Sequence, residues 1–413
     1  MNRRVVITGM EVTTSIGTGL QKFWDSALAG ISGTRRIASY DPSPYPTQMA
    51  GEVRDFNLEA YPQYDRPKRF PRATRFALFC AHRALEDAGL EPGSEVVKDA
   101  GVFLGTGQGG SPEVQQEAFH AYYTEGWKKV PVLSVPRGMP NSSANNVGIE
   151  LGLGGPNVTI TNACTSSAEA IGRAYEQIKW GKLSMVLAGG TEAMIWETMM
   201  IAWCKLRVMS TNNACPEKAS RPFDQARDGM VMAEGAGFLC LEDLESARAR
   251  SARIYAEIVG YAATCDASHI TAPSSAGQIR AVQGALHDAG LTTGEIDYIS
   301  AHGTATKLND LTETQTIKEM FGKRAYDIPV SSLKSMTGHA LGAAGVIEIV
   351  ATALSLREGK MHPTINLEIL DPQCDLDYIP NVSRSGDLRV ALSNHFAFGG
   401  ANTVLMLKRY ENV

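Results

Sequence analysis

The sequence has no apolar run of about 18 residues, the length that favours a membrane-spanning helix, and no excess of positive charge. We therefore expect no membrane segment. The net charge of −5 at pH 7 argues against a protein that binds nucleic acid, since such proteins carry a basic surface. The apolar stretch after Arg3 and Arg4 is too short for the hydrophobic region of a secretory signal, so we expect a cytoplasmic protein.

Cysteine is scarce and irregularly spaced. The seven cysteines are odd in number and none form a Cys-x-x-Cys pair: Cys80, Cys164, Cys204, Cys215, Cys240, Cys265 and Cys374. Disulfide frameworks and zinc sites usually show even numbers or such pairs, so we expect neither a disulfide framework nor a bound metal. Proline-rich and charged linkers are also lacking, which favours parts that pack tightly on each other.

A faint repeat is present instead. Residues 84–90 read ALEDAGL and residues 285–291 read ALHDAGL. Each segment follows a helical pattern and precedes an apolar run that ends in a glycine-containing turn, GVFLGTG in the first copy and YISAHGT in the second. Gly89 and Gly290 are placed to end the helices in a left-handed cap. The repeat predicts two copies of one α/β unit, with chance similarity of two short segments as the alternative.

Short aliphatic runs alternate with helical patterns along the rest of the chain. This alternation predicts a layered α/β fold with buried sheets. We expect strands near residues 4–9, 185–190, 237–241, 254–261, 328–332, 389–393 and 403–407, and helices near residues 74–85, 168–180, 277–286 and 345–358.

Cys164 is the strongest candidate nucleophile. It stands in NVTITNACTSSAE, where a β-branched run delivers the cysteine onto the first turn of a helical pattern. A helix N-terminus stabilises a thiolate and lowers a cysteine pKa into a range of about 3.5 to 7.5. The alternative is a buried structural cysteine.

Two histidines occur in similar surroundings. His302 ends the run YISAH and His339 lies in SMTGHALG, so each follows a predicted strand and adjoins glycine, where a side chain can project into a shared cavity. We expect both to act with Cys164. The other six histidines are expected to be core or surface residues: His82, His120, His269, His287, His362 and His395.

Five motifs in fixed order carry a resemblance to a known family. They are NACTSS around Cys164, RPFDQARDGMVMAEGAG (221–237), AHGTATKLND (301–310), KSMTGHALGAAG (334–345) and NHFAFGGAN (394–402). Together they resemble the elongating β-ketoacyl-[acyl carrier protein] synthases, of the KAS I/II type and including the type II polyketide ketosynthases. The resemblance covers nearly the whole chain.

The resemblance implies the thiolase fold, with duplicated halves in a layered αβαβα arrangement. The halves are expected at residues 1–250, carrying Cys164, and 251–413, carrying His302 and His339. Members are usually dimeric, so we expect a homodimer or a heterodimer with a homologous subunit. The implied reaction is decarboxylative Claisen condensation of an acyl group on the cysteine with malonyl-[acyl carrier protein].

The resemblance also implies roles for individual residues. Cys164 holds the acyl group, His302 and His339 donate hydrogen bonds to the enolate, and Lys334 is the supporting cation. Phe398 is the gate, followed by Gly399 and Gly400, and its backbone N–H completes an oxyanion site with that of Cys164. No cofactor is expected, because phosphopantetheine enters as part of the carrier-bound substrate. GTGQGG at residues 105–110 lacks the spacing of a dinucleotide-binding loop.

Further residues are expected around this centre. Thr304 and Thr306 match positions that bind the phosphopantetheine arm, with ordinary loop threonines as the alternative. The carboxylates of Asp310, Glu313 and Glu348 are expected to hold Lys334 and the histidines, with solvated surface residues as the alternative. Basic residues are expected to dock the acidic carrier protein, although each could be part of a solvated face: Arg66, Lys68, Arg69, Arg72, Lys128, Lys129, Lys205 and Arg207.

Several positions depart from the family pattern. Gln108 and Ser134 are expected to line the acyl pocket in place of apolar or aromatic residues, His395-Phe396-Ala397-Phe398 replaces Ser-Phe-Gly-Phe, and Asn162 replaces threonine. These departures favour, as an alternative to housekeeping fatty-acid elongation, a specialised type II polyketide or polyene pathway with a non-catalytic partner. The intact Cys164 argues against a chain-length subunit, and the absence of a second cysteine near Phe398 argues against a thiolase.

Overall fold

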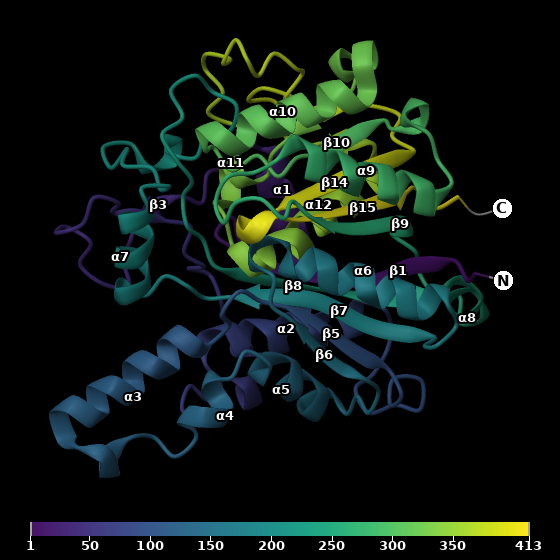
Figure 1. Ribbon diagram of the computed structural model, residues 1–413. Coiled ribbons are helices and arrows are strands. Elements are labelled where there is room, and N and C mark those ends of the chain that lie inside the picture. Colours follow the sequence, from purple (N-terminus) through teal and green to yellow (C-terminus); the bar gives the residue numbers. More distant parts are fainter. Residues whose placement is uncertain (1, 412–413) are drawn as a thin grey trace.

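The computed structural model describes residues 2–411. The strands of the main sheet run through the molecule as two layers (Figure 1). The first has the order β1 (Val5–Thr14), β8 (Gly235–Asp243), β7 (Met185–Glu192), β5 (Gly101–Gly105) and β6 (Asn157–Ile160). The second has the order β9 (Ala256–Cys265), β15 (Ala401–Lys408), β14 (Val390–Phe396), β10 (Tyr298–Ser300) and β11 (Val330–Ser331).

The two layers repeat one pattern of strand directions. In each, the first three strands pair antiparallel and the last three pair parallel. The layers also join at one edge, where β1 pairs antiparallel with β9 from Val5↔Ile258 to Ile7↔Ala256. The predicted duplication of one α/β unit is therefore present in the strand order, while the boundary between residues 250 and 251 stays a prediction.

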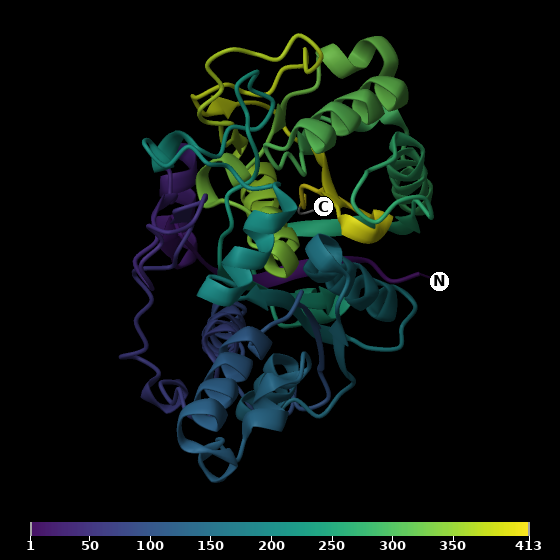
Figure 2. The ribbon, with the colours of Figure 1, turned by 60° about the vertical axis from the view of Figure 1, so that its left-hand side comes forward.

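Helices form three further layers (Figures 1 and 2). Helices α2 (Arg72–Asp87) and α5 (Ser142–Leu151) cover the outer face of the first sheet layer, and α9 (Ser275–Ala289) and α10 (Lys307–Phe321) cover that of the second. Between the sheets lie α6 (Ser166–Lys179) and α12 (Ala344–Glu358). Strand β1 is buried along its whole length because helices cover both of its faces. The expected αβαβα arrangement is confirmed.

The repeated Ala-Gly segments end equivalent helices. Gly89 follows α2 with φ of 70° and Gly290 follows α9 with φ of 65°. In both copies the next leucine N–H donates five residues back, from Leu90 to Leu85 O and from Leu291 to Leu286 O. Both turns are glycine-capped helix ends, as the sequence predicts.

The central helix α12 has an unusual composition. It is buried from Ala344 through Leu356, as expected for a helix between two sheets, and Glu348 is the one charged residue in that stretch. Burying a lone carboxylate is costly, so Glu348 requires partners within the core. Those partners belong to the site described below.

The remaining elements are either short or lie outside the five layers. Helix α3 (Ser111–Glu125) projects from the layers on the same side as α7 (Glu197–Leu206), and α4 (Ser134–Gly138) lies beside it (Figure 1). The short elements are α1 (Leu20–Leu28), α8 (Leu244–Ala249), α11 (Lys334–Thr337), β2 (Gly17–Thr18), β3 (Arg35–Arg36), β4 (Met49–Ala50), β12 (Lys360–Met361) and β13 (Arg384–Ser385). No helix within residues 2–411 is long and apolar enough to cross a membrane.

Candidate active site

Cys164 lies on a strained turn between β6 and α6. The residue before it, Ala163, has φ of 48°, a conformation that costs a non-glycine residue energy. Hydrogen bonds hold the turn: the Asn162 N–H donates to Ser166 Oγ at 2.8 Å, and Ser166 Oγ donates to Ala163 O at 2.7 Å. The thiol is therefore presented at the N-terminal end of α6, where the sequence predicts it.

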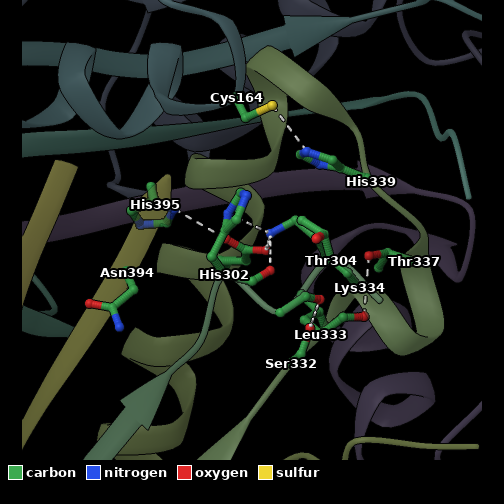
Figure 3. Close-up of polar contacts among 12 residues, drawn as sticks. Cys164, His302, Thr304, Ser332, Leu333, Lys334, Thr337, His339, Asn394 and His395 are labelled. Atoms are coloured by element: carbon green, nitrogen blue, oxygen red, sulfur yellow. Dashed lines mark hydrogen bonds and ion pairs between the residues drawn. The ribbon is translucent and has the colours of Figure 1, made fainter. Parts of the chain in front are cut away.

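Both predicted histidines reach the same place as Cys164 (Figure 3). The Nε2 atom of His339 is 3.1 Å from Cys164 Sγ, and the rings of His302 and His339 lie edge to face with centroids 5.4 Å apart. All three side chains line one cavity of about 320 Å³, although each is more than nine-tenths buried. The three residues, far apart in the sequence, thus form a single enclosed cluster.

Lys334 sets the orientation of His302. Its Nζ donates to His302 O at 2.7 Å and lies 3.3 Å from His302 Nδ1, and it also contacts Glu348 Oε1. An ammonium group has no acceptor, so Nδ1 must accept and the ring proton sits on Nε2. His302 can therefore donate a hydrogen bond into the cavity.

Both histidines are held neutral. Burial lowers the pKa of His302 well below its ordinary value, and the charge of Lys334 adds to that effect. Burial and the charge of Lys334 likewise lower the pKa of His339. A neutral imidazole can donate one hydrogen bond from its single N–H without adding a positive charge to the cavity.

The expected low pKa of Cys164 is wrong. Burial raises the pKa of its thiol to about 12, against the opposing charge of Lys334 and with the help of Glu192 and Glu348. Removing a thiolate from water outweighs the favourable helix terminus. The resting nucleophile is a thiol in contact with His339.

The predicted gate closes one side of the cavity. Phe398 stacks on Trp203 of α7, with ring centroids 6.1 Å apart and an angle of 24° between the planes. Gly399 follows with φ of 83°, and its N–H donates to Ile270 O. Phe398 and Trp203 both line the cavity, so movement of either ring would change access to Cys164.

The predicted threonines face the same cavity. Thr304 and Thr306 both line it, and their hydroxyl oxygens are 2.9 Å apart. Their backbone belongs to the loop that leads from His302 into α10. Two adjacent hydroxyls on the cavity wall can orient a polar chain that enters there.

The three predicted carboxylates have different partners. Glu348 contacts Lys334, as expected. Glu313 accepts hydrogen bonds from the N–H groups of His302 and Gly303, each at 2.8 Å, and burial raises its pKa to about 7. Glu313 therefore positions the backbone that carries His302.

Asp310 does not hold Lys334 or a histidine, which corrects the expectation. It is fully buried and its Oδ2 is 3.3 Å from Nε of Arg227, while Oδ1 accepts from the Thr304 N–H. Burial raises the pKa of Asp310 to about 6, against the opposing charge of Arg227. Asp310 thus anchors the threonine loop to the segment around Arg227.

Sequence reasoning missed Glu192, which ends β7. Its carboxylate accepts from the N–H groups of Gly107, Gln108, Gly109 and Gly342, at distances from 2.5 to 3.1 Å. It therefore ties the glycine turn after β5 to the turn that follows His339. The signal was available, because an acidic residue directly after the buried run MVLAGGT needs partners in the core.

Two predicted pocket residues lie elsewhere. Gln108 is exposed and does not line the cavity, because the turn bound by Glu192 directs its side chain outward. Ser134 begins α4 and its hydroxyl donates to Pro131 O at 2.7 Å, outside the cavity. The expectation that these two side chains line the cavity of this chain is wrong.

The basic residues divide into paired and unpaired ones. Arg69 pairs with Glu150 at 2.7 Å, and Arg72 pairs with Glu234 through two hydrogen bonds and is only partly exposed. These two residues serve the fold. Arg207 lines the cavity, and five others are exposed on the surface: Arg66, Lys68, Lys128, Lys129 and Lys205. Within the described part of the chain, no group of three or more His, Cys, Asp or Glu residues is arranged to hold a metal ion.

Comparison with known proteins agrees with this geometry. Residues 2–247 match the family described as beta-ketoacyl synthase, N-terminal domain, and residues 255–368 match beta-ketoacyl synthase, C-terminal domain. The chain is 42% identical over 412 residues to 3-oxoacyl-[acyl-carrier-protein] synthase 2 of Staphylococcus aureus (strain COL), covering 99% of each chain.

Solved structures extend the likeness to the whole fold. The ishigamide ketosynthase/chain length factor is 34% identical with a TM-score of 0.93, covering 100% of both chains. A ketosynthase in complex with a type II PKS acyl-carrier protein is 32% identical with a TM-score of 0.91, covering 99% of this chain and 100% of that one. The fold is that of the ketosynthases, and the chain belongs to the beta-ketoacyl synthase family.

Proposed function

We propose that the chain catalyses the decarboxylative Claisen condensation of an acyl group held on Cys164 with malonyl-[acyl carrier protein], which elongates a fatty-acyl or polyketide chain. The observation that carries this proposal is the meeting of Cys164, His302 and His339 in one buried cavity. The enzyme class is acyltransferase.

The first half of the reaction loads the enzyme. Cys164 Sγ attacks the carbonyl carbon of the acyl thioester, and its proton passes through Nε2 of His339 to the departing phosphopantetheine thiol. The 3.1 Å contact places the base on the thiol before substrate arrives. The backbone N–H groups of Cys164 and Phe398 serve the oxyanion of the tetrahedral intermediate.

The second half extends the chain. The bond between the malonyl methylene and its carboxylate breaks, carbon dioxide leaves, and negative charge develops on the thioester oxygen. Nδ1 of His339 has no hydrogen-bond partner in the described structure, so after loading its neutral ring can carry the proton on Nε2. The Nε2–H groups of His302 and His339 then donate to the thioester oxygen. The enolate carbon attacks the acyl carbonyl and releases Cys164 as a thiolate, which takes up a proton to restore the thiol. Donors that stand in place before charge develops are often the largest contribution to catalysis. We infer no added cofactor, because loss of carbon dioxide generates the carbon nucleophile and the two histidines supply the donors. Thr304 and Thr306 hold the arm that the carrier brings.

The implied partner is an acyl carrier protein. A similar ketosynthase is solved in complex with a carrier protein. In this chain Lys205 is exposed in the last turn of α7, and Arg207, directly after that helix, lines the cavity. A second subunit, identical or homologous, stays a prediction. The boundary between the two halves, at residues 250 and 251, also remains a prediction.

A specialised polyketide or polyene pathway is not favoured over general chain elongation. The departures at Gln108, Ser134, Asn162 and His395 do not line the cavity. The side-chain amide of Asn162 instead donates to Glu169 at 2.7 Å. Of the departures, Ala397 alone faces the substrate space, and it does not discriminate between the two pathways.

Intact-mass measurement tests the proposal. The protein is incubated with a panel of acyl-loaded carrier proteins, and the mass added to Cys164 is located by peptide mapping. We expect the acyl mass on the wild type and none on Cys164→Ala. Acylation elsewhere, or continued condensation by Cys164→Ala, would contradict the assignment.

A further inference from the structure

His395 occupies a position where the family pattern has serine, and its side chain reaches the machinery behind the cavity. It lies on β14 and is fully buried. Figure 3 shows its ring on the same side of Lys334 as His302. Its Nδ1 is 3.1 Å from Glu348 Oε2, and its Nε2 is 2.9 Å from Ser393 Oγ. His395 does not line the cavity, so it cannot touch substrate.

The two neighbours of His395 define its tautomer. Nδ1 and Glu348 Oε2 are 3.1 Å apart without the alignment of a hydrogen bond. A carboxylate only accepts, so this close contact is attractive only when Nδ1 carries the proton. Nε2 then accepts from the hydroxyl of Ser393. Burial lowers the pKa of His395 while the Glu348 contact raises it, and the balance is a lowered value that favours the neutral ring.

One carboxylate therefore joins His395 to Lys334. Oε1 of Glu348 contacts Lys334 Nζ, and Oε2 faces His395. The terminal torsion of a glutamate is broad and roughly two-fold, so a single contact leaves the carboxylate plane poorly defined. A second contact on the other oxygen defines that plane.

The consequence reaches His302. Lys334 Nζ lies 3.3 Å from His302 Nδ1 and keeps the ring proton on Nε2, where the proposed enolate needs it. Lys334 can hold that position only while its counterion is held. The order of contacts is His395, Glu348, Lys334 and His302.

We propose that His395 is a positioning residue for decarboxylation: by holding Oε2 of Glu348 it fixes the carboxylate against Lys334 and so maintains the donor tautomer of His302. The proposal rests on the proposed function. It predicts an effect on the step that uses His302 and little effect on loading of Cys164, where His339 acts.

Substitutions at His395 separate this role from a packing role. His395→Leu keeps the bulk and removes both nitrogens. His395→Asn places an amide donor near the position of Nδ1, whereas His395→Gln places it near that of Nε2. Each variant is assayed for acyl loading of Cys164 by intact mass and for carbon dioxide release from malonyl-[acyl carrier protein].

We expect His395→Leu and His395→Gln to lose about 10- to 100-fold in decarboxylation, with loading unchanged; the size is taken from outer partners that orient metal-binding histidines, which act through another residue in the same way. His395→Asn should recover most of the loss. Unchanged decarboxylation in His395→Leu, equal loss of both steps, or equal rates in the Asn and Gln variants would each overturn the proposal. Should the Leu variant not fold, the Asn and Gln pair decides. Failure of the wild type itself to load Cys164 would instead refute the proposed function.

Discussion

His339 Nε2 lies 3.1 Å from Cys164 Sγ, and burial keeps the thiol that it contacts protonated. The position of Cys164 before α6 does not by itself produce a thiolate, because burial of the side chain removes most of the water that would solvate the charged form. The nucleophile and its base therefore act as a pair. This pairing makes the reactivity of Cys164 dependent on pH in a direction that can be measured.

Alkylation of Cys164 should rise about tenfold per pH unit from pH 7 to pH 9 without reaching a plateau, since the raised thiol pKa leaves only a small thiolate fraction throughout. Iodoacetamide labelling followed by peptide mapping measures the rate. Cys215 and Cys265 are exposed and serve as internal comparisons. A plateau near pH 7 would restore the low pKa expected from the helix terminus.

Substitution of the two histidines should affect different steps of the reaction. His302→Ala should lose about 10² to 10³ in decarboxylation, the typical effect of removing one oxyanion donor, and should load Cys164 normally. His339→Ala should slow both steps, because its Nε2 also contacts the thiol. Acyl loading and carbon dioxide release are measured on each variant. Normal decarboxylation in both would show that the assigned roles are wrong.

A structural feature can be predicted from this sequence when neighbouring residues alone determine it. The caps at Gly89 and Gly290 follow from a local backbone requirement, and the layered fold follows from alternating patterns. The pairing of Asp310 with Arg227 joins segments far apart in the chain, so no spacing rule predicts it.

The same limit applies to the candidate site. Ordered motifs identify Cys164, His302 and His339, because each motif keeps its residue next to a glycine or helix start. The direction of the Gln108 side chain depends on the bond from its backbone N–H to Glu192, and only tertiary packing decides which groups Glu192 binds. The pKa of Cys164 likewise depends on burial by distant elements and not on the helix that follows it.

Asp310→Asn tests the corrected role of that carboxylate. Arg227 is buried, and removing a partner from a buried ion pair typically destabilises a protein by about 3 to 5 kcal/mol. We expect a loss near the lower end, because Arg227 also pairs with Asp371 at 2.7 Å. The free energy of unfolding in urea measures it, with Asp371→Asn as the more exposed control. Unchanged stability with lost decarboxylation would return Asp310 to the role first expected.

Charge reversal tests carrier docking. Lys68→Glu and Lys205→Glu should each raise the apparent KM for carrier-bound substrates severalfold and reduce its dependence on salt, because exposed rim charges chiefly govern encounter. Lys182→Glu makes the same charge change after α6, away from α7, and should have no effect. A small thioester without the carrier should react equally with all variants. Equal loss with both substrates would indicate damage to the fold.

His362 offers a test of burial through pH. It is fully buried between Tyr298 and Ser331, each with a hydroxyl 3.3 Å from a ring nitrogen, and burial lowers its pKa from 6.5 to about 4. Between those pH values the unfolded chain binds a proton at this site and the folded chain does not. The contribution of His362 to the free energy of unfolding is therefore fully present above about pH 6.5. As the pH falls from 6.5 towards 4, this contribution decreases by about 1.4 kcal/mol per pH unit.

The test compares wild type with His362→Gln by urea unfolding at pH 7 and pH 4.5. Other buried groups, such as Glu313 with its raised pKa, contribute a pH dependence of opposite sign, but they are common to both proteins and cancel in the difference. We expect the stability advantage of the wild type to shrink by roughly 2 to 3 kcal/mol between the two pH values, from the proton that only the unfolded wild type binds. A difference that stays constant would mean that His362 titrates alike in the folded and unfolded chains, and that its burial does not exclude the charged ring.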